Sequence, residues 1–311
     1  MPSLPDALAA GPVVLDGGLG TLLEERGNDL SSSLWSARLL LDRPEEIRAA
    51  HETFFRAGAR VAITASYQVS YERLEQEGLD APAVDLLLMR SVQLARRARS
   101  DLGLDGDAWI AASVGPYGAT LADGSEYTGD YGLTIDELRE WHRPRLRALA
   151  AAGPDLLAIE TIPSLAEVEA IAAELKGLGL PAWLSVTIDG SHLRTGESLA
   201  EAFSIAEATD EIVAVGVNCC DAPDVAGALA IGRGVTRKAL LAYPNSGEVW
   251  DAEARSWSGD GAPLAGYVGE WLSSGARLVG GCCRVGPDQI HGVAAAVAGA
   301  ANPGPAGRRE E

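Results

Sequence analysis

Cysteine and histidine are scarce in this chain, with four residues of each among 311. So few cysteines cannot form a disulfide scaffold for a chain of this length, and we interpret them as reduced thiols in a cytoplasm. The histidines, His51, His142, His192 and His291, are scattered and lack the spacing of metal ligands. We interpret each of them as a surface or packing residue, which argues against a metal site built from histidine.

Long apolar runs and an excess of basic charge are also missing. No segment approaches the roughly 20 apolar residues of a membrane span, and residues 1–6 lack the blocks of a signal peptide, so no membrane association is expected. Lysine and arginine number 25 against 44 acidic residues, for a net charge of −19. Because nucleic-acid binding requires a basic surface, this charge argues against a nucleic-acid partner. It would favour a cationic small molecule, but the acidic residues are spread along the chain, and we assign them to solubility.

Apolar strands alternate with helical segments along nearly the whole chain. Eight strands are predicted, at residues 13–18, 60–65, 109–114, 155–160, 182–187, 212–217, 239–243 and 276–279. Helices are predicted at residues 21–26, 44–59, 81–100, 134–152, 165–178, 199–209, 222–233, 263–275 and 287–300. The strands are continuously apolar rather than alternating, which is typical of a parallel sheet covered on both faces.

Eight such units predict an α/β fold with a single (β/α)8 barrel over residues 1–301. Residues 302–311 are predicted to be a disordered tail. An open doubly wound sheet is the alternative, which the even spacing of the units disfavours. The loops at 115–132 and 244–261 are longer than a simple connection requires, and such loops are often functional.

The first predicted strand ends in Asp16, Gly17 and Gly18. This segment lacks the lysine of a P-loop and the spacing of a dinucleotide fingerprint. The two glycines therefore indicate either a tight turn into the next helix or a close approach of the backbone to a bound substrate, and both interpretations remain open.

All four cysteines lie where two predicted strands end. Cys219 and Cys220 follow the sixth predicted strand, and Cys282 and Cys283 follow the eighth. Because a (β/α)8 barrel builds its active site at the carboxyl ends of its strands, we expect Cys219, Cys282 and Cys283 to converge there. Three thiolates suit zinc, which takes three protein ligands in catalytic sites and keeps a fourth position open. Cys220 is expected to pack as a small apolar residue.

Four segments resemble the homocysteine S-methyltransferase family, and the resemblance covers nearly the full chain. These segments are Asp16–Thr21, Thr64–Gln68, Gly216–Cys219 and Gly280–Cys283. The last two, at this spacing, are the most specific. Residues 113–119 and 122–127 resemble the branch of the family that uses S-methylmethionine.

The resemblance implies a zinc ion on Cys219, Cys282 and Cys283, with the homocysteine sulfur in the fourth position. The family ligand directly follows an asparagine, which selects Cys219 over its neighbour. A free thiol with a pKa near ~8.5 is mostly protonated at neutral pH, and zinc stabilises the reactive thiolate. The expected enzyme is a homocysteine S-methyltransferase that moves a methyl group from S-methylmethionine, or from S-adenosylmethionine, to L-homocysteine and forms methionine.

The resemblance also supports roles for acidic and aromatic residues at the same mouth. Glu160, and less firmly Asp16, would hold the ammonium group of homocysteine; an ion pair or helix-cap contact is the alternative. Tyr67, Tyr127 and Trp35 are candidates for cation–π contact with a sulfonium donor, or are ordinary packing residues.

Other functions remain as alternatives. A metal-dependent hydrolase on the same barrel would need histidine and carboxylate ligands, and clustered histidines are absent from the sequence. A non-enzymatic thiol or zinc-binding protein gives no reason for the two long loops. A methyltransferase that uses a different methyl donor, or a selenol acceptor, is a further alternative with the same type of methyl transfer. Since the chain lacks the long C-terminal arm of related betaine-using enzymes, a monomer is expected, with a small homo-oligomer as the alternative.

Overall fold

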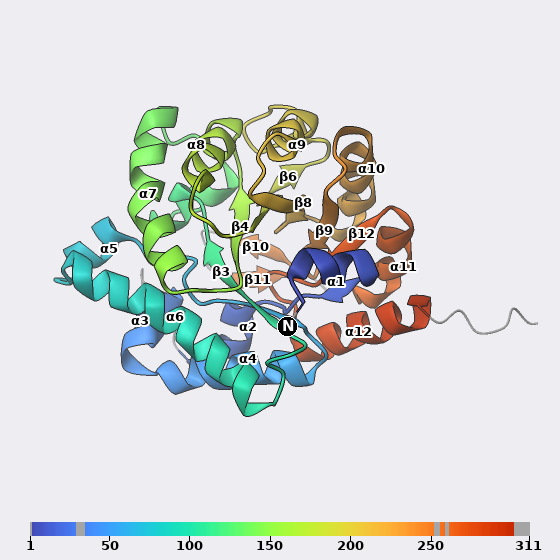
Figure 1. Ribbon diagram of the computed structural model, residues 1–311, viewed down its shortest axis with the longest axis horizontal. Helices are drawn as coiled ribbons and strands as arrows, with labels where there is room; N and C mark the ends of the chain where they lie inside the picture. The colour runs from blue at the N-terminus through green and yellow to red at the C-terminus, as the bar shows by residue number, and fades with distance from the viewer. Residues whose placement is uncertain (1, 29–34, 252–255, 259–260, 302–311) are drawn as a thin grey trace, which may run out of the picture.

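Eight parallel strands form the centre of the molecule (Figure 1). They are β1 (Val13–Val14), β2 (Val61–Ile63), β3 (Trp109–Val114), β4 (Leu156–Ile162), β5 (Ala182–Val186), β8 (Ile212–Asn218), β9 (Ala239–Tyr243) and β12 (Ala276–Val279). Hydrogen bonds join them in the order β1-β12-β9-β8-β5-β4-β3-β2 in this computed structural model, which describes residues 2–28, 35–251, 256–258 and 261–301.

The two edge strands of this order, β1 and β2, meet and close the sheet into a barrel. Leu15 forms a parallel bridge with Val61. The Asp16 N–H donates to the Val61 carbonyl at 3.1 Å, and the Arg60 N–H donates to the Val14 carbonyl at 2.8 Å. The predicted (β/α)8 barrel is therefore confirmed, and the open sheet is wrong.

Helices surround the barrel and cover the outer face of its strands (Figure 1). They are α2 (Leu19–Glu25), α4 (Pro44–Arg56), α6 (Ala81–Asp101), α7 (Ile135–Ala151), α8 (Leu165–Leu175), α9 (Leu199–Glu207), α10 (Val225–Val235), α11 (Ala265–Ser273) and α12 (Pro287–Ala301). Local sequence explains where several of them begin. Thr134 and Glu137 form the capping box that starts α7, and Pro44 stands in the first turn of α4, where its missing N–H costs nothing.

The strands carry two apolar layers because successive side chains of a strand point to opposite faces. One set, which includes Trp109, Ala111, Leu156 and Trp183, fills the interior of the barrel. The other set packs against the surrounding helices and forms the larger core. Strands buried on both faces explain why the sequence shows continuous apolar runs rather than alternation.

The first helix, α1 (Leu4–Ala10), closes the amino-terminal end of the barrel. Its buried side chains Leu4 and Leu8 pack with the interior residues of the strands. The indole N–H of Trp109, the first residue of β3, donates to the Pro2 carbonyl at 3.2 Å. Because this end is filled, the carboxyl-terminal mouth is the end available for a ligand.

The structure adds short elements that the sequence pattern did not predict. They are α3 (Trp35–Asp42), α5 (Tyr71–Gln76), the hairpin of β6 (Ile188–Asp189) with β7 (His192–Leu193), the hairpin of β10 (Val249–Asp251) with β11 (Ser256–Ser258), and the 3₁₀ helices Tyr117–Thr120 and Ser125–Tyr127. Elements of this length have too few residues to show a period, so contacts with the rest of the fold decide them.

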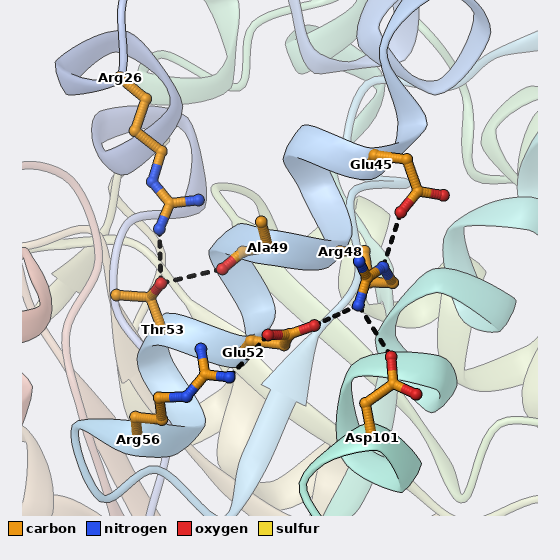
Figure 2. A network of polar contacts seen from close by, with 8 residues as sticks. All are labelled: Arg26, Glu45, Arg48, Ala49, Glu52, Thr53, Arg56 and Asp101. Carbon is orange, nitrogen blue, oxygen red and sulfur yellow. Dashed lines mark hydrogen bonds and ion pairs between the residues drawn. The ribbon is translucent and has the colours of Figure 1, made fainter.

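A network of ion pairs joins α4 to the end of α6 on the surface (Figure 2). Arg48 contacts Glu45 and Glu52 on its own helix and Asp101 at the end of α6. Arg56 makes a second contact with Glu52, at 2.8 Å. Exposed pairs of this kind contribute only ~0–1 kcal/mol each, so the buried face of α4 contributes most of its stability.

Some sequence-based predictions fall outside this description. Among the described residues, no helix is both long and apolar enough to cross a membrane. The predicted disordered tail at 302–311 and the side chain of Trp35 lie outside the described part of the chain. The domain boundary at residue 301 stays a prediction.

Candidate active site

A cavity of about 280 Å³ opens at the carboxyl-terminal mouth of the barrel. Its walls come from segments that follow several different strands, as is usual for enzymes with this fold. Among the lining residues are Gly17, Gly18, Thr64, Tyr67, Asp123, Glu126, Tyr127, Glu160, Thr161, Cys219, Tyr243, Cys282 and Cys283. The cavity therefore brings together most of the residues that the sequence singled out.

Three cysteines meet at this cavity because β9 lies between the two strands that carry them. The Cys219 N–H donates to the Tyr243 carbonyl at 3.4 Å, and the Cys282 N–H donates to the Pro244 carbonyl at 2.8 Å. The Sγ atoms of Cys219, Cys282 and Cys283 all lie within 4.8 Å of one another. This group is a candidate metal site, and it is formed from sulfur atoms alone.

Two of the three sulfurs are joined in this structure. Cys219 and Cys282 form a disulfide, with their Cα atoms 5.6 Å apart, and the Cys283 Sγ atom lies 3.7 Å from that of Cys219. This pairing departs from the expectation of reduced thiols, because the ends of β8 and β12 place the two cysteines side by side. Cys220 is only 1% exposed and packs in the outer hydrophobic core, which confirms its interpretation as a packing residue.

The backbone around the cavity is strained. Within the described ranges, four non-glycine residues have a left-handed φ. Ala122 at 57°, Thr161 at 62° and Cys219 at 47° line the cavity, and Arg284 at 63° directly follows the lining residue Cys283. Such conformations cost roughly 1–3 kcal/mol each and persist only where surrounding contacts enforce them. Their concentration at one mouth marks this region as the functional part of the barrel.

Asn218 is one of the contacts that enforce this geometry, and sequence reasoning gave it no role of its own. Its buried side chain accepts from the Thr161 N–H and donates to the Thr161 hydroxyl, both at 2.8 Å. The same amide nitrogen lies 3.9 Å from the Cys282 Sγ atom. Asn218 therefore links the end of β4 to the cysteine group.

Glu160 projects from β4 into the cavity and is held in a fixed orientation. The Ser113 hydroxyl donates to its Oε1 atom at 2.5 Å, and the Tyr243 hydroxyl donates to its Oε2 atom at 3.2 Å. The Trp183 indole N–H in turn donates to Tyr243 at 3.1 Å. Burial raises the pKa of Glu160 from 4.5 to about 7, although both hydroxyls favour the ionised form.

Asp16 is buried directly behind the lining of the cavity, at the end of β1. Its Oδ2 atom accepts from the Ile63 N–H at 2.8 Å, whereas its buried Oδ1 atom has no partner among the described residues. Burial, with a further contribution from the charge of Glu160, raises the pKa of Asp16 well above its usual range. Two nearby carboxyl groups, with no basic side chain lining the cavity beside them, are an arrangement that a bound ammonium group would stabilise.

The two glycines of the first turn are required by close packing. A Cβ atom on Gly17 would lie 2.3 Å from the Val285 carbonyl oxygen, and one on Gly18 would lie 2.6 Å from that of Cys282. The Gly18 N–H already donates to the Val285 carbonyl at 2.9 Å. Both glycines are therefore required by the packing of the turn, and a substrate contact at Gly17 or Gly18 stays a prediction.

Acidic and aromatic residues complete the wall. Tyr67 and Tyr127 line the cavity, and the Tyr127 hydroxyl lies 3.9 Å from the Cys219 Sγ atom. Glu126, which sequence reasoning placed only within a functional loop, also lines it; burial raises its pKa, and its Oε2 atom has no partner within the described residues. No lysine, arginine or histidine of the described chain lines this cavity, so its walls favour a cation.

The histidines do not contribute to the site. His51 and His142 are fully buried in α4 and α7, and His142 contacts Glu167 at 2.8 Å. His192 and His291 are exposed. Among the described residues, the cysteines form the only group of three or more metal-ligating side chains that lie close together.

The sequence profile described as homocysteine S-methyltransferase matches residues 13–297. The chain belongs to the homocysteine S-methyltransferase family. The homocysteine S-methyltransferase of Escherichia coli is 44% identical over 287 residues, covering 89% of this chain and 93% of the relative. A selenocysteine methyltransferase of Astragalus bisulcatus is 41% identical over 306 residues, covering 90% of each.

Solved structures of a homocysteine methyltransferase agree with this assignment. The metallated form of MmuM from Escherichia coli has a TM-score of 0.84 at 41% identity, covering 93% of this chain and 98% of that one. Its oxidised form has a TM-score of 0.83 at 41% identity, covering 91% and 95%. The predicted membership of the homocysteine S-methyltransferase family, and with it the prediction of an enzyme, is confirmed.

Proposed function

We propose that this homocysteine S-methyltransferase moves the methyl group of S-methylmethionine to the sulfur of L-homocysteine, with zinc held by Cys219, Cys282 and Cys283. The convergence of three sulfur atoms within 4.8 Å, in the cavity that also contains Glu160, carries this proposal. A cytoplasmic location and a monomeric state stay predictions.

The donor set fits zinc. Thiolates are soft ligands that select zinc among the common divalent cations, and three of them leave a fourth position for a substrate atom. Reduction of the Cys219–Cys282 disulfide would supply two of these thiolates, and Cys283 would supply the third. When bound, zinc would favour the thiolate form of homocysteine at neutral pH, so the protein need not provide a general base.

Glu160 would bind the ammonium group of homocysteine. Ser113 and Tyr243 fix its carboxylate, so little rotational freedom remains to be lost on binding. The unpartnered Oδ1 atom of Asp16 lies in the same region of the barrel rim and would gain a compensating positive charge. This contact would set the distance between the substrate backbone and its sulfur atom.

The walls of the cavity suit a sulfonium donor. Glu126 and Asp123 supply negative charge without a basic residue beside them, and Tyr67 and Tyr127 supply aromatic faces. A desolvated cation–π contact contributes up to about 2 kcal/mol. The cavity of about 280 Å³ lies near the lower end of ligand pockets, roughly 300–1,000 Å³, which favours S-methylmethionine over the bulkier S-adenosylmethionine.

The transfer itself needs no proton movement within the protein. The homocysteine sulfur forms a bond to the methyl carbon while the bond from that carbon to the sulfonium sulfur breaks. The electron pair of the broken bond stays on the leaving sulfur, so the cationic donor becomes neutral methionine and the acceptor also becomes methionine. Opposite charges cancel in this step, and a cavity that excludes water favours it.

The test is methionine formation by reduced, zinc-loaded protein, with S-methylmethionine and S-adenosylmethionine supplied separately. We expect about one zinc per chain and turnover with S-methylmethionine. Cys282→Ser should lose both zinc and turnover, whereas Cys220→Ser, which changes a packing cysteine next to Cys219, should keep both. Full activity in Cys282→Ser would refute the metal site, and a preference for S-adenosylmethionine or for a selenol acceptor would replace the substrate assignment.

A further inference from the structure

A fully buried arginine on α7 holds two of the segments that shape the cavity. Arg145 is 1% exposed. Its guanidinium donates to the carbonyl groups of Ser66 at 2.7 Å, Tyr67 at 2.5 Å and Gly115 at 2.9 Å. Ser66 and Tyr67 belong to the turn after β2, and Gly115 directly follows β3. One side chain on an outer helix therefore connects the ends of two neighbouring strands.

This arginine is unusual because it has no carboxylate partner. Among the described residues, no ion pair includes Arg145, and its Nε atom has no hydrogen-bond partner. The ring of Trp141, whose centroid lies 5.7 Å from the guanidinium carbon, offers a cation–π contact. Burial lowers the pKa of Arg145 to about 10, so the group stays protonated at neutral pH. Burying an unpaired charge is costly, and a functional reason for retaining it is therefore expected.

The contacts of Arg145 lead to Glu160 through buried hydroxyl groups. The Ser66 hydroxyl donates to the Ser113 carbonyl at 2.8 Å and also lies 2.8 Å from the Thr64 hydroxyl. The Ser113 N–H donates to the Thr64 hydroxyl oxygen at 3.1 Å. Ser113 then donates its own hydroxyl to Glu160. The turn that Arg145 holds is thus the support of the residue that orients Glu160.

The positive charge of Arg145, like the hydrogen bonds that it makes, favours a Glu160 carboxylate that is ready to bind an ammonium group. This charge lowers the pKa of Glu160 and opposes the effect of burial. The titratable groups found near Glu160 in the described chain include Asp16, Tyr67, Tyr243, Cys283 and Arg145. Arg145 is the cation among them.

We propose that Arg145 is a positioning residue for homocysteine: it fixes the turns after β2 and β3 so that Ser113 can orient Glu160 toward the substrate ammonium group. The inference rests on the proposed role of Glu160. It assigns to an outer helix a contribution to acceptor binding, with a smaller effect on the donor through Tyr67, whose carbonyl Arg145 also holds.

Steady-state kinetics of Arg145→Met test this role. We expect KM for homocysteine to rise about tenfold, the effect of losing roughly one charge-assisted contact at the site, with a smaller change in KM for the donor. The matched control is Arg143→Met on the same helix, because Arg143 contacts Glu174 on the outer surface, at 2.8 Å and 3.0 Å. That control should leave both KM values unchanged.

Arg145→Lys separates charge from geometry. Lysine keeps the positive charge but has no planar fork to reach carbonyl groups on two turns. We expect its KM for homocysteine to lie between those of wild type and Arg145→Met. If Arg145→Met fails to fold, Arg145→Lys takes its place in every comparison, and a wild-type KM in this variant would overturn the proposal.

A double-mutant cycle with Glu160→Gln distinguishes positioning from a general structural effect. If Arg145 acts through Glu160, its substitution should change KM for homocysteine much less in the Glu160→Gln background than in wild type. Additive effects on KM, or equal values for Arg145→Met and Arg143→Met, would overturn the proposal while leaving the proposed function intact. Absence of homocysteine turnover in the wild-type enzyme would instead refute the proposed function, and the role of Arg145 with it.

Discussion

Acidification should weaken binding at the ammonium site through Glu160. Burial raises the pKa of this carboxyl group to about 7 in the ligand-free enzyme. Only the ionised form attracts an ammonium group, so affinity is fully present above this pKa and is lost as the pH falls through it. Glu160 would be about 90% ionised at pH 8 and about 10% ionised at pH 6.

The size of the effect follows from these fractions. When a ligand binds only one form of a site, its apparent dissociation constant is the intrinsic constant divided by the fraction in that form. The apparent affinity for the ammonium group should therefore fall about ninefold to tenfold between pH 8 and pH 6.

Methionine is the right probe for this measurement because it carries the same ammonium and carboxylate groups as homocysteine but no thiol. Homocysteine itself would add the pH dependence of thiol ionisation. We would measure binding of L-methionine to the metal-free enzyme, the form to which this pKa applies, by calorimetry at pH 6, 7 and 8. Affinity that does not change with pH, or the same profile in Glu160→Gln, would refute the reasoning.

Three further predictions concern the donor, the strained turn and the barrel. Glu126→Gln should raise KM for a sulfonium donor about three- to tenfold because it removes negative charge from the cavity wall. Asp123→Asn, which changes an exposed neighbour, should raise the donor KM less, and equal donor KM values for the two variants would contradict this prediction. Asn218→Ala removes both contacts that hold Thr161 and should lower kcat/KM for homocysteine about 10- to 100-fold; unchanged kinetics would show that Thr161 needs no such support. Gly216→Ala places a Cβ atom 1.9 Å from the Leu241 carbonyl oxygen and should destabilise the fold by about 1–3 kcal/mol in denaturant unfolding. Gly227→Ala, where the Cβ atom meets nothing within 4 Å, is its control and should not be destabilising.

Much of the fold could be predicted because its signals are local. Continuous apolar runs, such as that of Trp109–Val114, indicate strands buried on both faces, and the capping box at Thr134 marks the start of α7. The alternation of strands and helices then leaves few topologies. Short elements such as α5 were missed because six residues do not reveal a period.

The candidate metal group was also predictable, but for a different reason. Parallel strands in a barrel end at the same mouth, so cysteines that follow two strands must lie near one another. The choice of Cys219 over Cys220 came from the family resemblance. The structure shows its physical basis: Cys219 turns into the cavity with a left-handed φ of 47°, and Cys220 packs in the outer core.

The sequence by itself therefore determined the barrel, the position of the cysteines and the acidic residue on β4. Only the tertiary structure decided how Glu160 is oriented and which distant groups support it. Arg145 lies 79 residues from Ser66 and 30 residues from Gly115 along the chain, and its contacts are with backbone carbonyl groups. Every residue has a carbonyl group, so no pattern of side chains in the sequence can reveal which of them a buried arginine will reach.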